Sequence, residues 1–283
     1  MLISIVIPSF NRASVISKTL DSILAQEYQD WECIIVDDNS VDNTFQVVES
    51  YVKKDSRFKV LRNCRKKGAQ GARNTGILYS KSDWVCIFDS DDYMYPNYLQ
   101  EMTRSINDEV DVVVCHSNVV RVEDNEIIRK LDSSCDGFIE EKLFSGEVYV
   151  PNNQTLIRKS KIISIGLLDE DCPSMQEWDT HIRLASIQSQ YITIPKVLVD
   201  YFVGAKDAIS TDMKREIKGR IYILKKHLKL WYKYHNSLNR YCAQILYLSI
   251  KCPGIKNKIK AIIQLTRIVP SLPIRLFKYK IFK

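Results

Sequence analysis

Short apolar runs that stop abruptly at polar residues recur through the first 110 residues of this 283-residue chain. Residues 2–8 (LISIVIP), 31–36 (WECIIV) and 83–88 (DWVCIF) are rich in apolar and β-branched side chains, which is typical of buried strands. Stretches with helical periodicity separate them, at 14–24 and at about 41–53. This alternation predicts an α/β fold with a doubly wound, mostly parallel sheet.

The composition agrees with a large globular core and argues against other classes of protein. Hydrophobic residues make up 45% of the chain and charged residues 27%. No apolar run approaches the roughly 18–20 residues that span a bilayer, and the opening MLISIVIPSF lacks the features of a secretory signal. The eight cysteines form no CxxC pair and no Cys/His cluster, which favours buried thiols in a reducing compartment. We therefore expect a cytoplasmic protein.

Acidic residues follow directly after two of the predicted strands. Asp37 and Asp38 end one apolar run, and Asp89, Ser90 and Asp91 follow another. Because ligands of such sheets bind beyond the carboxyl ends of the strands, these residues should share one edge. They could simply form Asp-rich turns. Alternatively, one or two carboxylates could hold a hard divalent cation whose other ligands are water and a diphosphate.

Four segments of this region carry a family resemblance. They are SIVIPSFNR (4–12), CIIVDDNSVDNT (33–44), GARNTGI (71–77) and CIFDSDD (86–92). In this order and at these separations they resemble the signatures of family 2 glycosyltransferases, and the resemblance resumes at 150–211. It implies a GT-A fold, which is Rossmann-like, and an inverting transfer from a UDP-sugar that depends on Mn²⁺ or Mg²⁺.

The resemblance assigns four residues to a nucleobase pocket. Pro8 and Phe10 match positions that line the pocket, and Asp38 matches the aspartate that hydrogen-bonds uracil. Arg73 matches a basic residue beside the base or the diphosphate. Two plainer interpretations stay open: Asp37 and Asp38 could close the strand in an Asx-turn, and Arg73 could be a surface helix residue.

The DSDD sequence matches the family's acidic motif. The resemblance implies that Asp89 lies near the ribose and that Asp91 binds the metal, which stabilises the leaving diphosphate as a Lewis acid. Asp92 could support this site or cap the following helix. The predicted donor site is completed by Asn11, Arg12 and Ser90.

The stretch CPSMQEWDTHIRLA (172–185) resembles the family's acidic motif at a helix start. It places Glu177 at the position of the base that deprotonates the acceptor hydroxyl. Gln176 replaces the usual preceding acid, so Asp179 is an alternative base. A third interpretation is a capping box in which Glu177 only pairs with the backbone near Ser174. The helix dipole would lower the pKa of a carboxylate at this position.

Two further segments resemble the acceptor side of the family. The first, VPNNQTLIRKS (150–160), implies contacts to sugar hydroxyls; its polar residues could also be those of an ordinary loop. The second, YFVGAKDAIST (201–211), resembles a segment that closes over the diphosphate. Lys206 and Asp207 stand where many relatives have a metal-binding His, so a third protein ligand is not assigned, and Lys206 could contact phosphate. The predicted acceptor site comprises Asn152, Asn153, Thr155 and Trp178.

The charge is distributed very unevenly along the chain. Residues 214–283 hold 18 Lys/Arg and one acid, Glu216, whereas the rest holds 23 basic and 33 acidic residues. Basic and aromatic residues alternate in this region, which favours an anionic membrane surface as the partner of residues 212–283, with no nucleic acid expected. Leu230, Trp231 and Phe277 are the predicted interfacial side chains. Helical packing with a solvated basic side is the alternative.

The predicted organisation has three parts. Residues 1–110 form the nucleotide-sugar-binding half and 111–211 the acceptor and base half of one GT-A domain, while 212–283 form a basic amphipathic helical tail. We expect a hexosyltransferase that acts on a glycan acceptor, a polyprenyl-diphosphate-linked sugar of bacterial surface polysaccharide synthesis, at the inner face of the cell membrane. The alternative is a catalytically inactive protein that binds nucleotide-sugars or polyanions.

Overall fold

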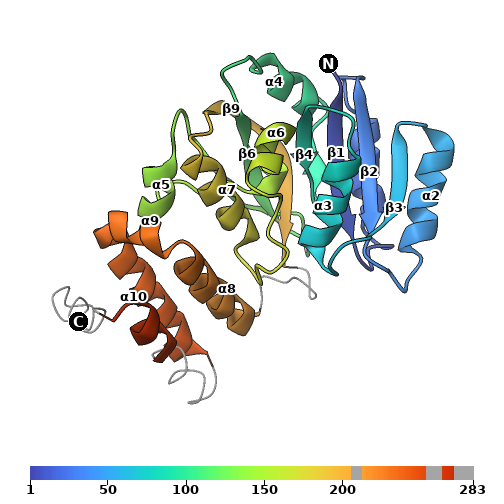
Figure 1. Ribbon diagram of the computed structural model, residues 1–283. Helices are drawn as coiled ribbons and strands as arrows, with labels where there is room; N and C mark the ends of the chain where they lie inside the picture. The colour runs from blue at the N-terminus through green and yellow to red at the C-terminus, as the bar shows by residue number, and fades with distance from the viewer. Residues whose placement is uncertain (205–211, 253–262, 271–283) are drawn as a thin grey trace.

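The computed structural model describes residues 1–204, 212–252 and 263–270. Within these residues the strands form one mixed sheet in the order β3-β2-β1-β4-β8-β6-β9-β5, with β7 beside β6 (Figure 1). The strands are β1 (Ile3–Ser9), β2 (Trp31–Asp37), β3 (Phe58–Arg62), β4 (Trp84–Ile87), β5 (Tyr93–Met94), β6 (Val112–Arg121), β7 (Ile127–Leu131), β8 (Thr155–Arg158) and β9 (Tyr191–Val203).

Helices alternate with strands in the first part of the chain, and α8, α9 and α10 follow the last strand. They are α1 (Ile16–Leu24), α2 (Thr44–Lys54), α3 (Ala69–Tyr79), α4 (Tyr98–Arg104), α5 (Glu140–Ser145), α6 (Lys159–Ser164), α7 (Gln176–Ser186), α8 (Met213–Lys226), α9 (Leu228–Lys233) and α10 (His235–Lys251), with a 3₁₀ turn η1 (Asn152–Gln154). Alternate residues of β1 belong to different hydrophobic clusters: Ile5 packs with α1, α2 and α4, and Val6 packs with α3, α5, α6 and α7. Both faces of the sheet are therefore covered.

The first half of the sheet confirms the predicted parallel order. β1 pairs in parallel with β2 and β4, and β2 pairs in parallel with β3. Ser9 lies opposite Asp37, so the carboxyl ends of β1 and β2 coincide. In the second half β8 is antiparallel to both β4 and β6, whereas β6 and β9 are parallel. The strand ends that carry the polar motifs therefore meet at one edge, as expected.

A third hydrophobic cluster joins the helices α8, α9 and α10 to the middle of the chain. Trp231 stacks on Tyr241, with ring centroids 4.4 Å apart, and both belong to one cluster with Phe144 and Ile182. Figure 1 shows α5 and α7 between the sheet and these three helices. The described part of 212–283 is thus packed against the preceding residues.

This packing corrects one expectation about the basic region. Trp231 is only 1% exposed, so the prediction that it inserts into a membrane interface is wrong. Leu230 packs against the same cluster, and Phe277 lies outside the described residues. No helix in the described ranges combines the length and the apolar character needed to cross a bilayer.

Candidate active site

Asp37 and Asp38 end β2 but have different surroundings. The Asp37 carboxylate pairs with Arg62 and accepts the backbone N–H of Ser40 at 3.2 Å, three residues on, so it makes local contacts at the strand end without the two-residue bond of an Asx-turn. Asp38 accepts Asn63 Nδ2 at 2.6 Å on Oδ1 and the backbone N–H of Gly68 at 2.8 Å on Oδ2. Each carboxylate oxygen can accept a further donor, so these bonds leave acceptor capacity for the predicted uracil contact of Asp38.

Hydrogen bonds connect the loop after β1 to the loop after β2. Asn11 adopts a left-handed φ of 53°, donates its N–H to Ser40 Oγ at 2.9 Å and accepts the N–H of Val41 at 2.9 Å on Oδ1. This geometry gives Asn11 a role in holding the two loops together. Phe10 is 42% exposed, and Lys67 Nζ lies 5.1 Å from its ring centroid. Pro8 is buried within β1. Of these predicted donor residues, the Phe10 ring is the one open to a nucleobase.

Arg73 lies at the centre of the site. It is only 4% exposed, which rules out the surface-helix interpretation. Its Nη2 donates to Asp89 Oδ1 at 2.6 Å, and its Nη1 lies 3.5 Å from Gln176 Oε1. Burial opposes the charged guanidinium, but Asp89 and Glu177 outweigh it and raise the pKa of Arg73. Arg73 therefore joins the end of β4 to the start of α7.

The acidic residues after β4 divide into exposed and buried ones. The side chains of Asp89 and Asp91 are 30% and 39% exposed, and Arg12 Nη2 lies 4.0 Å from Asp91 Oδ2. Asp92 is fully buried and accepts Asn153 Nδ2 at 2.5 Å and the N–H of Phe202 at 3.0 Å. Burial, together with the charges of Asp89 and Asp91, raises its pKa. Asp92 thus supports the site, and capping of α4 is excluded because that helix has no side-chain cap. Ser90 is also buried.

This edge can accommodate a divalent cation. Asp89 and Asp91 offer hard carboxylate oxygens that are partly exposed. In the part of the chain that the structure describes, no group of three or more His, Cys, Asp or Glu side chains could hold a metal. A cation here would need water and a diphosphate as further ligands, as Mg²⁺ commonly does. Lys206 and Asp207 lie outside the described residues.

Glu177 lies in the first turn of α7 and faces this site. Burial raises its pKa, the Asp89 charge adds to the rise, and Arg73 opposes it. Asn152 Nδ2 lies 3.4 Å from Glu177 Oε1. The capping-box interpretation is wrong: the N-cap residue is Met175, no side chain caps the helix, and Ser174 Oγ donates to Arg215 O instead. The expected lowering of the Glu177 pKa by the helix dipole is also wrong, because desolvation dominates.

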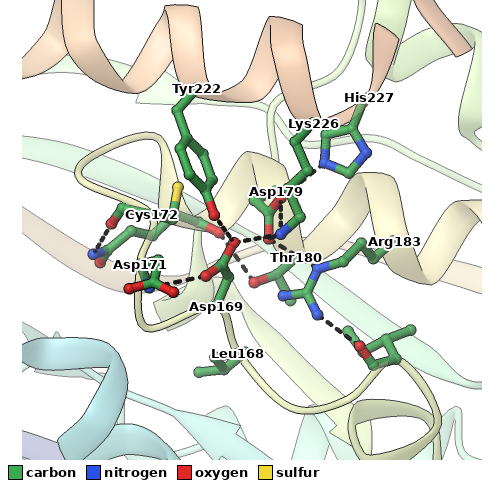
Figure 2. A network of polar contacts seen from close by, with 12 residues as sticks. Leu168, Asp169, Asp171, Cys172, Asp179, Thr180, Arg183, Tyr222, Lys226 and His227 are labelled. Carbon is green, nitrogen blue, oxygen red and sulfur yellow. Dashed lines mark hydrogen bonds and ion pairs between the residues drawn. The ribbon is translucent and has the colours of Figure 1, made fainter. Parts of the chain in front are cut away.

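Asp179 is unsuited to be the base, which corrects the alternative assignment. It is completely buried, and its carboxylate contacts Arg183 Nε, Lys226 Nζ and His227 Nε2, each at 2.8 Å (Figure 2). Burial alone would raise its pKa, but the His227 hydrogen bond and the two cations lower it to about 2. So weak a base, enclosed by three donors, cannot take a proton from a sugar hydroxyl.

The predicted acceptor residues do not form one surface. Asn152 and Asn153 are both buried, and their side-chain amides bind Glu177 and Asp92, so they support the two halves of the site. Thr155 is completely buried and its hydroxyl donates to Asn152 O, so its prediction as an acceptor contact is wrong. The half-buried Trp178 ring packs at 5.7 Å from Trp231 and 5.0 Å from Tyr241, measured between centroids, within the third cluster.

Two tyrosines of the site were missed by the sequence interpretation. Burial, Glu177 and Asp89 raise the pKa of Tyr149, and burial, Asp92 and Asp89 raise that of Tyr201. Although 47% of Tyr149 as a whole is exposed, the shift places the burial at its hydroxyl end, near Glu177, and leaves much of the rest of the side chain open. Both residues adjoin motifs that the sequence did reveal, at 150–160 and 201–211.

Comparisons with known proteins agree with the resemblance. Residues 4–166 match the family model described as glycosyl transferase family 2. The chain is 39% identical over 130 residues to the Escherichia coli UDP-Glc:alpha-D-GlcNAc-diphosphoundecaprenol beta-1,3-glucosyltransferase WfgD, covering 46% of this chain and 50% of that protein. It is 34% identical over 107 residues to the Campylobacter jejuni GalNAc(5)-diNAcBac-PP-undecaprenol beta-1,3-glucosyltransferase, covering 38% and 35%. The matches span half or less of these relatives.

Solved structures with the same fold extend over nearly the whole chain. Staphylococcus aureus TarS 1-349 in complex with UDP-GlcNAc superposes with a TM-score of 0.63 at 16% identity, covering 97% of this chain and 92% of that one. The mannosyltransferase PcManGT from Pyrobaculum calidifontis, in complex with GDP-Man and Mn2+, gives 0.64 at 17% identity, covering 99% and 83%. The predicted GT-A fold is therefore confirmed.

Proposed function

Because the chain belongs to glycosyl transferase family 2, we propose that it transfers a hexose from a UDP-sugar to a hydroxyl of a polyprenyl-diphosphate-linked sugar. The observation that carries this proposal is the position of Glu177. A half-buried carboxylate, whose pKa is raised by desolvation, lies close enough to Arg73 and Asp89 for their charges to act on it, next to the edge where the polar strand ends meet. Arg73 thus links Asp89, on the proposed donor side, to the start of the helix that carries the proposed base.

On the donor side, the chain's own residues would bind and orient the nucleotide. Asp38 would accept the uracil imide N–H, the Phe10 ring would contact the base, and Asp91 would hold a divalent cation together with the diphosphate. The cation would supply Lewis-acid stabilisation of the negative charge that develops on the leaving UDP. Arg73 fixes the orientation of Asp89, proposed to bind near the ribose, through their 2.6 Å ion pair.

On the acceptor side, Glu177 would take the proton of the attacking hydroxyl. The acceptor oxygen forms a bond to the anomeric carbon, the bond from that carbon to the UDP oxygen breaks, and the proton ends on the Glu177 carboxylate. This single displacement inverts the anomeric configuration. A pKa raised by burial suits the role, because a carboxylate with a higher pKa is a stronger base once ionised.

The acceptor class is proposed from the two bacterial relatives. Their names specify transfer to sugars carried on diphosphoundecaprenol. The half-exposed Tyr149 beside Glu177 offers a stacking surface and a hydroxyl for such a sugar. Asn152 and Asn153 position this side of the site.

A donor screen followed by an acceptor assay tests the proposed function. UDP-, GDP- and dTDP-hexoses are titrated with Mn²⁺, and the donors that bind are incubated with a synthetic short-chain lipid-diphosphate GlcNAc. We expect UDP-hexoses to bind and one of them to be transferred. Binding of UDP-hexoses with no transfer would instead favour an inactive nucleotide-sugar-binding protein. No binding of any donor would contradict both functions.

We also propose that residues 212–283 associate with the inner membrane surface peripherally, where a lipid-linked acceptor lies. Lys214, Lys218, Lys229 and Lys251 are exposed on the C-terminal helices, and Tyr247 and Ile250 are exposed on α10. Replacing the four lysines with Gln should weaken binding to phosphatidylglycerol vesicles by about 10²–10³-fold, since each contributes about 1 kcal/mol. The attraction should also fall as salt rises.

Vesicle co-sedimentation across a salt series measures this effect. The matched control replaces four exposed lysines of the acidic part of the chain with Gln, namely Lys53, Lys54, Lys81 and Lys130. This variant should sediment like the unaltered protein. Equal loss of binding in both variants would show a dependence on total charge alone and would overturn the proposed membrane-facing surface.

A further inference from the structure

Two acidic side chains at the start of α7 point in different directions. Glu177 and Asp179 are two positions apart, which is about 200° around a helix, so they cannot face the same neighbour. Glu177 lies toward Asn152 and Arg73, in the candidate active site. Asp179 lies toward the C-terminal helices. The side of α7 opposite to Glu177, the proposed base, therefore contacts the C-terminal helices through Asp179.

An ion cluster forms this far-side contact, shown in Figure 2. Asp179 binds Arg183 of its own helix, and Lys226 and His227 at the end of α8. Lys226 also pairs with Asp169, which accepts the Tyr222 hydroxyl at 2.8 Å. We call Asp169, Asp179, Arg183, Tyr222, Lys226 and His227 the α7 ion cluster. Within the α7 ion cluster, Lys226 pairs with both acidic residues, Asp169 and Asp179.

The face of α8 that carries Tyr222 and Lys226 also contacts the segment before α7. Arg215, Gly219, Tyr222 and Lys226 recur at helical spacing and form one stripe. Arg215 Nε donates to Pro173 O at 2.6 Å, and a Cβ at Gly219 would lie 1.9 Å from Ser174 Oγ and 2.8 Å from Ser174 O. Only glycine permits this approach. The stripe thus contacts the segment from Asp169 to Asp179 at successive turns.

The start of α7 has little local support of its own. Its N-cap residue, Met175, has φ 60° and ψ 33°, a left-handed conformation that is costly for a side chain of this kind, and no side chain caps the helix. A helix start without a cap is less well fixed than a capped one. Besides a local bond from Gln176 Nε2 to Cys172 O at 2.9 Å, α7 is held by contacts from elsewhere in the fold, and the α7 ion cluster supplies those made by Lys226 and His227.

We propose that Lys226 and Asp179 are positioning residues for catalysis, which hold α7 so that Glu177 meets the acceptor hydroxyl. The inference rests on the proposed function, since it takes Glu177 as the base. Both residues lie on the side of α7 away from Glu177. Their effect is geometric: a displacement of a reacting group by about 1 Å can cost about 10²-fold in rate.

The proposed role is tested by comparing the variant Lys226→Met with the control variant Lys225→Met. The two lysines are neighbours, and the substitutions change charge and length identically, but Lys225 is exposed and away from the cluster. With a UDP-hexose and the short-chain acceptor, Lys226→Met should lower kcat by about 10- to 100-fold. The donor KM and the affinity for UDP with Mn²⁺ should not change. Lys225→Met should match the unaltered protein, and Lys226→Arg should recover most of the rate.

The comparison is repeated in a Glu177→Gln background to separate positioning from stability. If Lys226 acts through Glu177, Lys226→Met adds little to the loss already caused by Glu177→Gln. Additive losses, or a lower melting temperature with unchanged kcat, would overturn the inference while leaving Glu177 as the base. Normal turnover by Glu177→Gln alone would overturn the proposed base, and the inference with it. Should Lys226→Met not fold, His227→Gln is judged by the same criteria.

Discussion

Glu177→Gln is expected to lower the rate of transfer by about 10²–10⁴-fold, the usual contribution of a positioned general base. Glutamine keeps the shape of the side chain but cannot accept the proton of the attacking hydroxyl. Donor binding should be nearly unchanged, because Glu177 lies on the acceptor side of Arg73. The measurement is kcat with a UDP-hexose and a lipid-diphosphate acceptor, alongside the affinity for UDP with Mn²⁺. Glu141→Gln, at an exposed position of α5, is the matched control.

The pH dependence gives this prediction a second readout. The pKa of Glu177 is raised by burial, and the base must be ionised to act. Activity should therefore be present at higher pH and lost as the pH falls through a pKa raised from the ordinary value of a glutamate. The residual activity of Glu177→Gln should lack this acidic limb. Near-normal turnover, or an unchanged pH profile, would exclude Glu177 as the base.

Asp91→Ala is expected to abolish metal-dependent donor binding. Without this carboxylate the cation loses a hard oxygen ligand and should no longer bind. The negative charge of the diphosphate would then be repelled by the remaining acidic side chains. Unfolding should not be the cause, since the Asp91 side chain is 39% exposed and its loss leaves no cavity in the core. Calorimetric titration of UDP with and without Mn²⁺ measures the effect.

Asp83→Ala is the control for this metal-site prediction. Asp83 is exposed and directly precedes β4, so it lies at the opposite end of the strand from Asp91. Its replacement should leave UDP affinity and the dependence on Mn²⁺ unchanged. If Asp91→Ala behaves in the same way, the assignment of the metal to Asp91 is wrong.

Much of the α/β architecture could be predicted because the signals are local. The apolar runs 2–8 and 31–36 lie within a residue or two of β1 and β2, and their polar ends meet at one edge because parallel strands align their carboxyl ends. The position of Glu177 near the start of a helix was also predictable from the motif at 172–185. These features depend on neighbouring residues and on spacing.

The errors concern residues whose partners lie far away in the sequence. Asp179 looked like a possible base until the structure placed Lys226 and His227 around it, 47 and 48 positions later. Trp231 looked interfacial because basic residues surround it in sequence, but it fills a cluster with Phe144. The pKa of Glu177 follows the same rule, since burial by distant segments outweighs the local helix dipole.

The most direct test of the central claim is the anomeric configuration of the product. The protein is incubated with the UDP-hexose that it binds best, Mn²⁺ and the lipid-diphosphate GlcNAc acceptor, and the new linkage is determined by proton NMR. Single displacement assisted by Glu177 predicts a β-linkage from the α-linked donor, formed by the unaltered protein and nearly absent with Glu177→Gln. An α-linked product would contradict direct displacement and with it the proposed role of Glu177.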